Sequence, residues 1–333
     1  MSAINKFICI IGLILLCITS GGCSILESPT ESQTIDPPVQ SSDERASKRN
    51  MTVYLLDSWS NVVPITMSVS NPGRMAELTL NALAEGNPIV QRERLPEGFR
   101  APLPKDTVVK AIHYSKEDKV VTVDFSEHFV LYNIENERKM VEAVVWALTE
   151  LPGIEQVQIQ VTGKQLEQMP LDGMPLNQPL SRTMGINLQK NVDTDWSRSL
   201  PVTIYFRGQT DQRFDYFVPV TSWVSYKEDP VQSVMMQLLE GPDFGSQMKD
   251  IFADDVHLTG VTQTQSEYVV GLKTTTSDST KQLSQTAMQA IALSYHLLDR
   301  SSQVRLNVHH GSATETLSME NVIKPTAINM ISP

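Results

Sequence analysis

The segment "MVEAVVWALTELPGIEQVQIQV" (residues 140–161) decides the fold of this chain, because a helix pattern changes into a strand pattern within it. Its first half has apolar residues at the three- and four-residue spacing of an amphipathic helix. Pro152-Gly153 stops that helix, and "QVQIQV" (156–161) alternates as a half-buried strand does. The pattern therefore predicts a helix over residues 136–151 that is followed directly by a strand.

The same pattern returns later, in "AMQAIALSYHLLDRSSQVRLNV" (287–308). Two shorter stretches recur in the same order: "TVYLLD" (52–57) as "TIYFRG" (203–208), and "LNALAEGNP" (80–88) as "MQLLEGPD" (236–243). The offset between matched pieces stays at about 150 residues, which is the behaviour of an internal repeat. Three matches in one order indicate a duplicated domain.

Each copy is predicted to contain an earlier helix as well. In the first copy this helix ends at Gly86, and in the second it covers "DPVQSVMMQLLEGP" (229–242). Asp229 can cap the second of these helices, and Pro230 suits its first turn.

Strand patterns fill the rest of each copy. Residues 51–56 and 201–206 are rich in β-branched and aromatic residues, and "TVVKAIHYS" (107–115) with "KVVTVDFS" (119–126) predicts an antiparallel hairpin. The order β-β-α-β-β-α-β predicts an α/β (α+β) sandwich in each copy, a small sheet with two helices on one face.

The chain is predicted to hold two such domains behind an N-terminal targeting region. The domains cover residues 51–190 and 201–333, and "NVDTDWSRSL" (191–200) joins them. Residues 1–22 are predicted to be a signal peptide. Residues 23–50 are rich in Ser, Thr, Pro and charge, which predicts a disordered tether.

The cysteines of the chain all lie at its N-terminus: Cys9, Cys17 and Cys23. "FICIIGLILLCI" (7–18) has the length of a signal-peptide core and is too short to span a bilayer. "TSGGCS" (19–24) resembles the cleavage site of bacterial lipoproteins, although Ser20 stands where leucine is usual. We predict cleavage before Cys23 and lipidation of its sulfur; an ordinary secretory signal peptide is the alternative.

The predicted mature chain is acidic. Cleavage removes Lys6 and no acidic residue, so the net charge of −11 becomes −12. This charge argues against a nucleic-acid binder, which needs a basic surface. It also argues against binding of anionic lipid by a polybasic segment, so the lipid on Cys23 is predicted to be the membrane tether.

A sheet with helices on one face leaves edge strands, which can pair with a strand of another protein. Lysine and glutamate residues in these strands can instead guard them against pairing. The sequence leaves both possibilities open.

The sequence contains no HExxH or GxSxG motif and no phosphate-binding glycine loop. Its histidines are His113, His128, His257, His296, His309 and His310. The adjacent pair at 309–310 would point to opposite faces of a strand, which makes a poor shared metal site. We predict no catalytic residue, no cofactor and no metal site.

Paired carboxylates could serve a glycosidase, and candidates are Asp124 with Glu127 and Asp254 with Asp255. Asp124 lies at a strand end, where a carboxylate commonly caps the next turn, and the second copy has Lys273 near that position. A structural role is therefore favoured.

Tryptophans could offer a platform for stacking sugars. Trp146 is predicted to lie in the core with Leu148. Trp59 and Trp223 lie in less periodic stretches and are better platform candidates, although packing is favoured for them too.

Several longer stretches resemble the GerM family of spore formation and germination lipoproteins. They are "LPEGFRAPLPKDTVV" (95–109), "VVTVDFS" (120–126), "MPLDGMPLNQPLSRTMGINL" (169–188) and "YFVPVT" (216–221). The lipoprotein signal, the tether and the tandem copies match the plan of the family, so the resemblance covers essentially the whole chain. The second copy departs from the pattern, with "VVGLKTTT" after its strand and no Pro-Gly after its last helix.

The resemblance implies two tandem GerMN domains, related to the ring-building motifs of secretion-system proteins, and no catalytic residues. It implies a place on the extracytoplasmic face of the membrane between mother cell and forespore, with partners in the intermembrane sporulation channel complex. We predict a lipid-anchored, non-catalytic scaffold required for spore formation and germination. The alternatives are a protein that binds or processes peptidoglycan and a receptor for a small ligand.

Overall fold

The computed structural model describes residues 48–69, 74–88, 95–189, 196–252, 255–274, 284–301, 303–310, 313–318 and 328–331. Cys23, the predicted signal peptide and nearly all of the predicted tether lie outside these residues, as do residues 191–195 of the predicted linker.

The two repeats contain the same elements in the same order. The first has β1 (Arg49–Leu56), β2 (Val62–Val69), α1 (Met75–Ala82), β3 (Val109–Ser115), β4 (Val120–Phe125), α3 (Glu137–Leu148), β5 (Gln156–Val161) and β6 (Lys164–Gln165). The second has β7 (Ser199–Gln209), β8 (Asp215–Ser225), α4 (Pro230–Glu240), β9 (Val256–Gln263), β10 (Glu267–Thr274), α5 (Gln285–Leu298), β11 (Gln303–His310) and β12 (Ala313–Ser318). Short 3-10 helices cover Glu127–Val130, Ile134–Asn136, Arg182–Met184 and Trp196–Arg198.

Each repeat has a four-stranded mixed sheet, in the order β3-β4-β5-β6 or β9-β10-β11-β12. The central pairs, β4 with β5 and β10 with β11, are parallel, and the outer pairs are antiparallel. Parallel neighbours need a long crossover, which α3 and α5 provide. The predicted combination of a small sheet with helices is therefore confirmed in both repeats.

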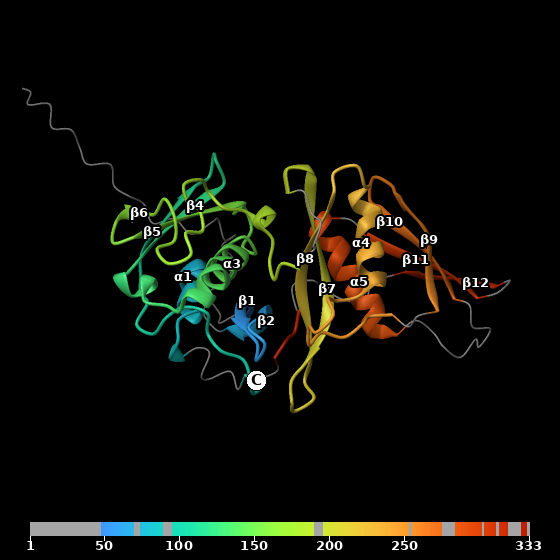
Figure 1. Ribbon diagram of the computed structural model, residues 1–333, viewed down its shortest axis with the longest axis horizontal. Coiled ribbons are helices and arrows are strands. Elements are labelled where there is room, and N and C mark those ends of the chain that lie inside the picture. Colours follow the sequence, from blue (N-terminus) through green and yellow to red (C-terminus); the bar gives the residue numbers. More distant parts are fainter. Residues whose placement is uncertain are drawn as a thin grey trace, which may run out of the picture. The chain divides into compact units, whose positions relative to one another are not determined.

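The first hairpin of each repeat does not join the four-stranded sheet. β1 with β2, and β7 with β8, form separate two-stranded sheets. In the second repeat α4 and α5 lie between the β7–β8 hairpin and the four-stranded sheet (Figure 1). The helices thus bury apolar side chains on two sides, so a third layer adds to the predicted sandwich.

The helix ends follow the local signals. The Asp229 carboxylate accepts a hydrogen bond from the Val231 backbone nitrogen at 2.9 Å, with Pro230 in the first turn of α4. The helix ends at Glu240, and its C-cap is Gly241, whose φ of 86° suits glycine. α3 stops at Leu148, before the predicted end, because Thr149 caps it and bonds back to Val145 at 2.8 Å.

The core contains the side chains that the periodic patterns assigned to it. Val157, Ile159 and Val161 of β5 are buried, and the glutamines between them are half-buried. Trp146 and Leu148 are buried as predicted. Within the part of the chain that the structure describes, no helix has the length and apolarity needed to cross a membrane.

Candidate functional site

Of the candidate carboxylate pair in the first repeat, Asp124 makes a structural hydrogen bond and Glu127 is exposed. The Asp124 carboxylate accepts a hydrogen bond from the Gly163 backbone nitrogen at 2.8 Å, and so caps the turn between β5 and β6. Glu127 lies exposed in the following 3-10 helix. Asp254 lies outside the described residues. Asp124 thus makes a capping contact, at the turn between β5 and β6 rather than at the turn that follows its own strand.

Apart from the adjacent pair His309 and His310 on β11, the histidines lie on separate elements. His113 and His257 are exposed on β3 and β9, and His296 is half-buried on α5. His309 pairs with Lys273 and Thr314 in the sheet. In the described ranges, no three His, Cys, Asp or Glu side chains come close enough to hold a metal ion.

The candidate tryptophan platforms differ in exposure. Trp59, in the turn between β1 and β2, is 55% exposed, and Trp223 is half-buried on β8. The predicted packing is therefore partly met by Trp223, whereas the side chain of Trp59 is mostly exposed to solvent.

The seam between the two repeats is built around a buried asparagine. Asn187 donates its side-chain amide to the carbonyl oxygens of Val62 in β2 at 2.8 Å and of Pro219 in β8 at 2.7 Å. Its amide oxygen accepts from the Val62 nitrogen at 2.7 Å and from Lys139 at 3.1 Å. A φ of 46° is a conformation that asparagine tolerates. One side chain therefore ties both hairpins together.

A second asparagine repeats this arrangement. Asn329 donates to the carbonyl oxygens of Pro64 in β2 at 2.8 Å and of Phe217 in β8 at 2.9 Å, and it accepts from the Phe217 nitrogen at 2.7 Å. Its φ is 50°, close to that of Asn187. Each repeat thus ends in an asparagine that bridges the same two strands.

The backbone next to each asparagine crosses to the hairpin of the other repeat. Residues 186–189 pair with Thr221 of β8: Thr221 donates to Ile186 at 2.9 Å, and Gln189 donates to Thr221 at 3.0 Å. Residues 328–331 pair with Thr66 of β2 through the corresponding bonds, at 3.1 and 3.0 Å. The end of each repeat therefore completes the hairpin of the other.

Charged and phenolic side chains add to the seam. The buried Tyr216 hydroxyl donates to Asp57 at 2.9 Å, and burial together with that carboxylate raises the pKa of Tyr216. Glu150 pairs with Arg182, which also stacks on Trp146 with its guanidinium 4.5 Å from the ring centre. Arg300 of the second repeat donates to the Thr149 carbonyl at 3.1 Å.

A buried carboxylate fixes the loop before the seam. Glu137 is 1% exposed and accepts from the Tyr132 hydroxyl at 2.6 Å and from the backbone nitrogens of Leu171, Asp172 and Met174 at 2.8–3.0 Å. Burial alone would raise the pKa of Glu137, but these hydrogen bonds lower it.

The sequence pattern did not identify the two asparagines as functional. Their signal is short: "GINLQ" (185–189) and "AINMI" (327–331) share only an Ile-Asn pair. A comparison of the two repeats could have identified both asparagines from this pair. An asparagine at the same place in two copies is a signal of a left-handed backbone, which asparagine tolerates.

Pieces of the chain cover several strand edges. Lys249 bonds to Arg207 on β7, Leu180 pairs with Val157 on β5, and Arg100 pairs with Leu56 on β1. No such backbone pairing covers the outer edges of β3 and β9 among the described residues. β3 carries Lys110, whereas "VHLTGVTQ" of β9 has no charged lysine, arginine, aspartate or glutamate. β9 is thus the less guarded edge.

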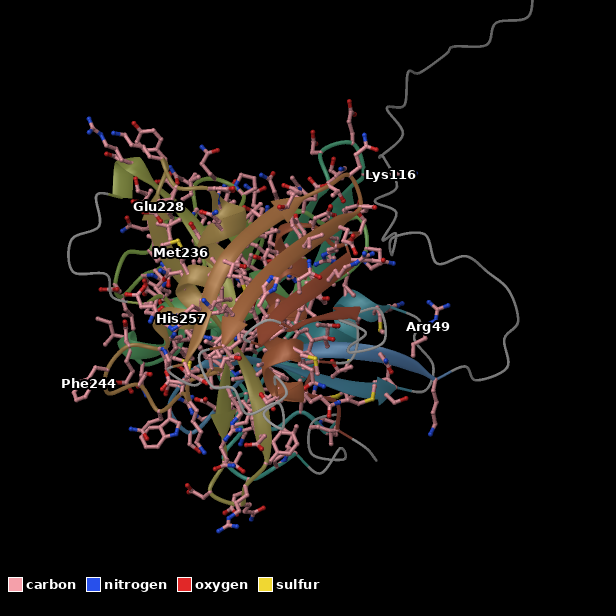
Figure 2. The ribbon with its side chains drawn as sticks, turned by 90° about the vertical axis from the view of Figure 1, so that its right-hand side faces the viewer. Arg49, Lys116, Glu228, Met236, Phe244 and His257 are labelled. Atoms are coloured by element: carbon pink, nitrogen blue, oxygen red, sulfur yellow. The ribbon has the colours of Figure 1, made fainter. Side chains whose placement is uncertain are left out.

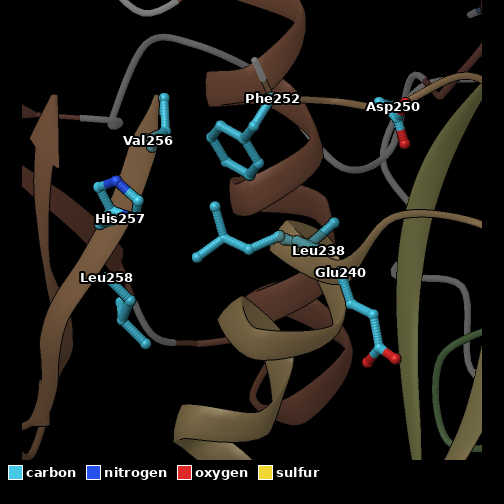
Figure 3. Close-up of a pocket in the computed structure, with 8 residues that line it drawn as sticks. Leu238, Glu240, Asp250, Phe252, Val256, His257 and Leu258 are labelled. Atoms are coloured by element: carbon cyan, nitrogen blue, oxygen red, sulfur yellow. The ribbon is translucent and has the colours of Figure 1, made fainter. Parts of the chain in front are cut away.

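A groove of about 440 Å³ lies beside β9. Leu238, Leu239 and Glu240 of α4, Asp250 and Phe252 of the following loop, and Val256, His257 and Leu258 of β9 line it. Figure 3 shows Leu238 and Phe252 between the β9 side chains on one side and Glu240 and Asp250 on the other. The lining thus contains both apolar side chains and two carboxylates.

Comparison with known proteins relates the whole two-repeat body to one family. The family model described as "Germane: Sporulation and spore germination" matches residues 52–167 and 203–310. The chain is 31% identical over 275 residues to the spore germination protein GerM of Bacillus subtilis (strain 168), covering 73% of this chain and 74% of that protein.

A solved structure matches both repeats together. The tandem GerMN domains of the sporulation protein GerM from Bacillus subtilis superpose with a TM-score of 0.75 at 29% identity, covering 86% of this chain and all of that one. The predicted tandem GerMN architecture is therefore confirmed, and the chain belongs to the GerM-like family of sporulation and spore germination proteins.

Proposed function

We propose that this protein is a lipid-anchored, extracytoplasmic scaffold required for spore formation and germination, and that it catalyses no reaction. Its family membership supports a role in sporulation. The lipoprotein-like sequence before Cys23 supports attachment to a membrane through diacylglycerol. In this proposal that membrane lies between mother cell and forespore, as the resemblance to the family implies. The partners would be proteins of the intermembrane channel complex.

The observation that carries the scaffold proposal is the reciprocal seam. Asn187 and Asn329 hold the hairpins of both repeats with buried hydrogen bonds, so the two GerMN domains keep a fixed spacing. A protein that positions other proteins needs such fixed spacing, because a flexible joint would leave its binding surfaces without a defined relation.

The test is a deletion strain that carries the wild-type chain or Cys23→Ala. We expect heat-resistant spores from the wild type, and few from the variant because it is released from the membrane fraction. Normal spore numbers with the deletion alone would remove the proposed requirement. An unchanged membrane fraction for Cys23→Ala would contradict the lipid anchor.

The non-catalytic part of the proposal is tested separately. Purified chain beginning at residue 24 should release no muropeptide from peptidoglycan, and Asp124→Asn should change nothing, because Asp124 caps a turn. Muropeptide release that Asp124→Asn abolishes would favour a peptidoglycan-processing enzyme.

A further inference from the structure

A pocket of about 390 Å³ lies at the seam, where two arginines from different repeats line its wall. Arg182 begins the 3-10 helix near the end of the first repeat, and Arg300 follows α5 of the second repeat. Both guanidinium groups reach the same carboxylate oxygen of Glu150, Arg182 through a short hydrogen bond and Arg300 at 3.5 Å. Two cations therefore share one carboxylate at this pocket.

The contacts of Arg182 hold its guanidinium group in place. Its Nε donates to the Thr149 hydroxyl at 2.9 Å, its Nη2 donates to the Trp146 carbonyl at 3.3 Å, and the group stacks on the Trp146 ring. The Arg182 side chain is only 22% exposed. Its Nη1 makes no hydrogen bond to any described residue. A donor that is already fixed loses little conformational entropy when it binds a ligand.

Arg300 brings further donors to the same wall. Its Nη2 donates to the Thr149 carbonyl at 3.1 Å, whereas its Nε and Nη1 make no hydrogen bond within the described ranges. A guanidinium group has a planar set of donors that matches a carboxylate or a phosphate. Arg182 and Arg300 together therefore offer such an anion donors from both repeats.

The ion pairs around the pocket contain more cations than anions. Lys119 pairs with Glu155, which lines the pocket, at 2.6 Å. Arg182 and Arg300 share Glu150. These pairs thus combine three cations with two carboxylates, although the chain as a whole has a net charge of −11. One further carboxylate would balance them, whereas a phosphate monoester, with a charge of about −1.5 to −2, would exceed the balance.

The rest of the wall combines apolar residues with hydroxyl groups. Leu151, Gly153 and Ile154 come from the turn between α3 and β5. The hydroxyl groups of Ser181 and Thr183 also belong to the wall, and they lie 2.7 Å apart. Small-ligand pockets have volumes of roughly 300–1,000 Å³, and this pocket lies near the lower end of that range. It therefore suits a small group that has both an apolar part and a carboxylate.

We propose that this pocket binds a carboxylate that lies next to a small apolar group. The carboxylate accepts hydrogen bonds from Arg182 and Arg300, and the apolar group packs on Leu151 and Ile154. Because the two arginines belong to different repeats, the ligand contacts both of them across the seam. An N-acylated amino acid and the C-terminal end of a peptide both present this chemistry. The site goes beyond the proposed scaffold function and does not depend on it.

The test is an NMR titration of the purified chain beginning at residue 24 with N-acetylalanine, at pH 7.5 and constant ionic strength. We expect saturable binding that is at least tenfold tighter than binding of N-acetylalanine amide or of inorganic phosphate. Arg300→Gln should weaken it at least tenfold, because donors are lost. Thr183→Asp should do the same, because it adds a competing carboxylate at an exposed position of the wall.

Two arginines elsewhere provide matched controls. Arg305 is 49% exposed, compared with 48% for Arg300, and it also pairs with a carboxylate, that of Glu267. Arg49 projects outward at the start of β1 (Figure 2). Arg305→Gln and Arg49→Gln should leave the affinity within twofold of the wild type. Circular dichroism checks that each variant is folded.

Absence of saturable binding would overturn the proposal, as would equal binding of the acid and its amide or tighter binding of phosphate. An affinity that both Arg300→Gln and Thr183→Asp leave unchanged would also overturn it. Acetyl-glycyl-glycyl-alanine distinguishes the two sources: tighter binding than N-acetylalanine supports a peptide end, and equal binding supports the small molecule. Because no readout involves sporulation, failure of this test would leave the scaffold function standing.

Discussion

Asn187 and Asn329 bridge the same pair of strands: each donates its amide to a carbonyl of β2 and to a carbonyl of β8, at distances of 2.7–2.9 Å. The two residues come from the ends of different repeats, and both have a left-handed backbone. The repeats are thus related by a reciprocal exchange, because each needs the last segment of the other to satisfy its hairpin. This exchange makes the pair behave as one body.

Asn187→Ala should destabilise the chain by about 3–5 kcal/mol, because buried polar groups of Val62 and Pro219 lose their partners at about 1–3 kcal/mol each. Urea unfolding of the chain beginning at residue 24 measures this change. Asn133→Ala is the control, since Asn133 is exposed and makes no capping side-chain bond; its effect should stay within about 0.5 kcal/mol. Equal effects of the two variants would contradict the anchoring role of Asn187.

Glu137→Gln should destabilise the chain by about 2 kcal/mol at pH 7, because charge-assisted hydrogen bonds become neutral ones. The folded state lowers the pKa of Glu137, so its contribution is present above the unfolded pKa and is lost as the pH falls through the folded pKa. The difference from the wild type should therefore shrink below about pH 4. Urea unfolding from pH 7 to pH 3 tests this, with the exposed Glu135→Gln as control; a difference independent of pH would oppose it.

His296→Gln should remove part of the loss of stability that the wild type shows on mild acidification. Burial and, next, the charge of Arg300 lower the pKa of His296, so the unfolded chain takes up a proton more readily than the folded one. Stability should then fall below about pH 6.5 in the wild type. Thermal unfolding at pH 7.5 and 5.5 measures the difference. The exposed His113→Gln is the control and should lose as much thermal stability between the two pH values as the wild type does. An equal loss in His296→Gln would contradict a contribution of buried His296 to the pH dependence.

Local signals in the sequence predicted the helices, strands and caps well. The cap at Asp229 and the alternation in β5 each depend on residues within a few positions of one another, whereas α3 ends at Leu148, before the Pro-Gly pair that was predicted to stop it. The structure keeps them because tertiary packing agrees with the local preference. The tandem arrangement was also readable, since a duplication leaves matched pieces in order.

The sequence could not show the seam or the groove, because both depend on contacts between distant residues. Asn187 meets β2 across more than a hundred residues, and nothing near it in the sequence names Val62 as its partner. The separate hairpin layer has the same origin, since strand patterns do not say which sheet a strand joins. The sequence also could not show which strands lie at the sheet edges. The structure places β3, which carries Lys110, and β9, which has no lysine, arginine, aspartate or glutamate, at those edges.

The distance between spin labels on the two repeats tests the central claim most directly. Residues 24–333 contain no cysteine, so Glu117→Cys and Gln265→Cys place one label on an exposed turn of each repeat. Double electron–electron resonance should give one narrow distance distribution, which broadens when Asn187→Ala and Asn329→Ala are added. A broad distribution in the chain without the alanine changes would contradict a scaffold of fixed spacing.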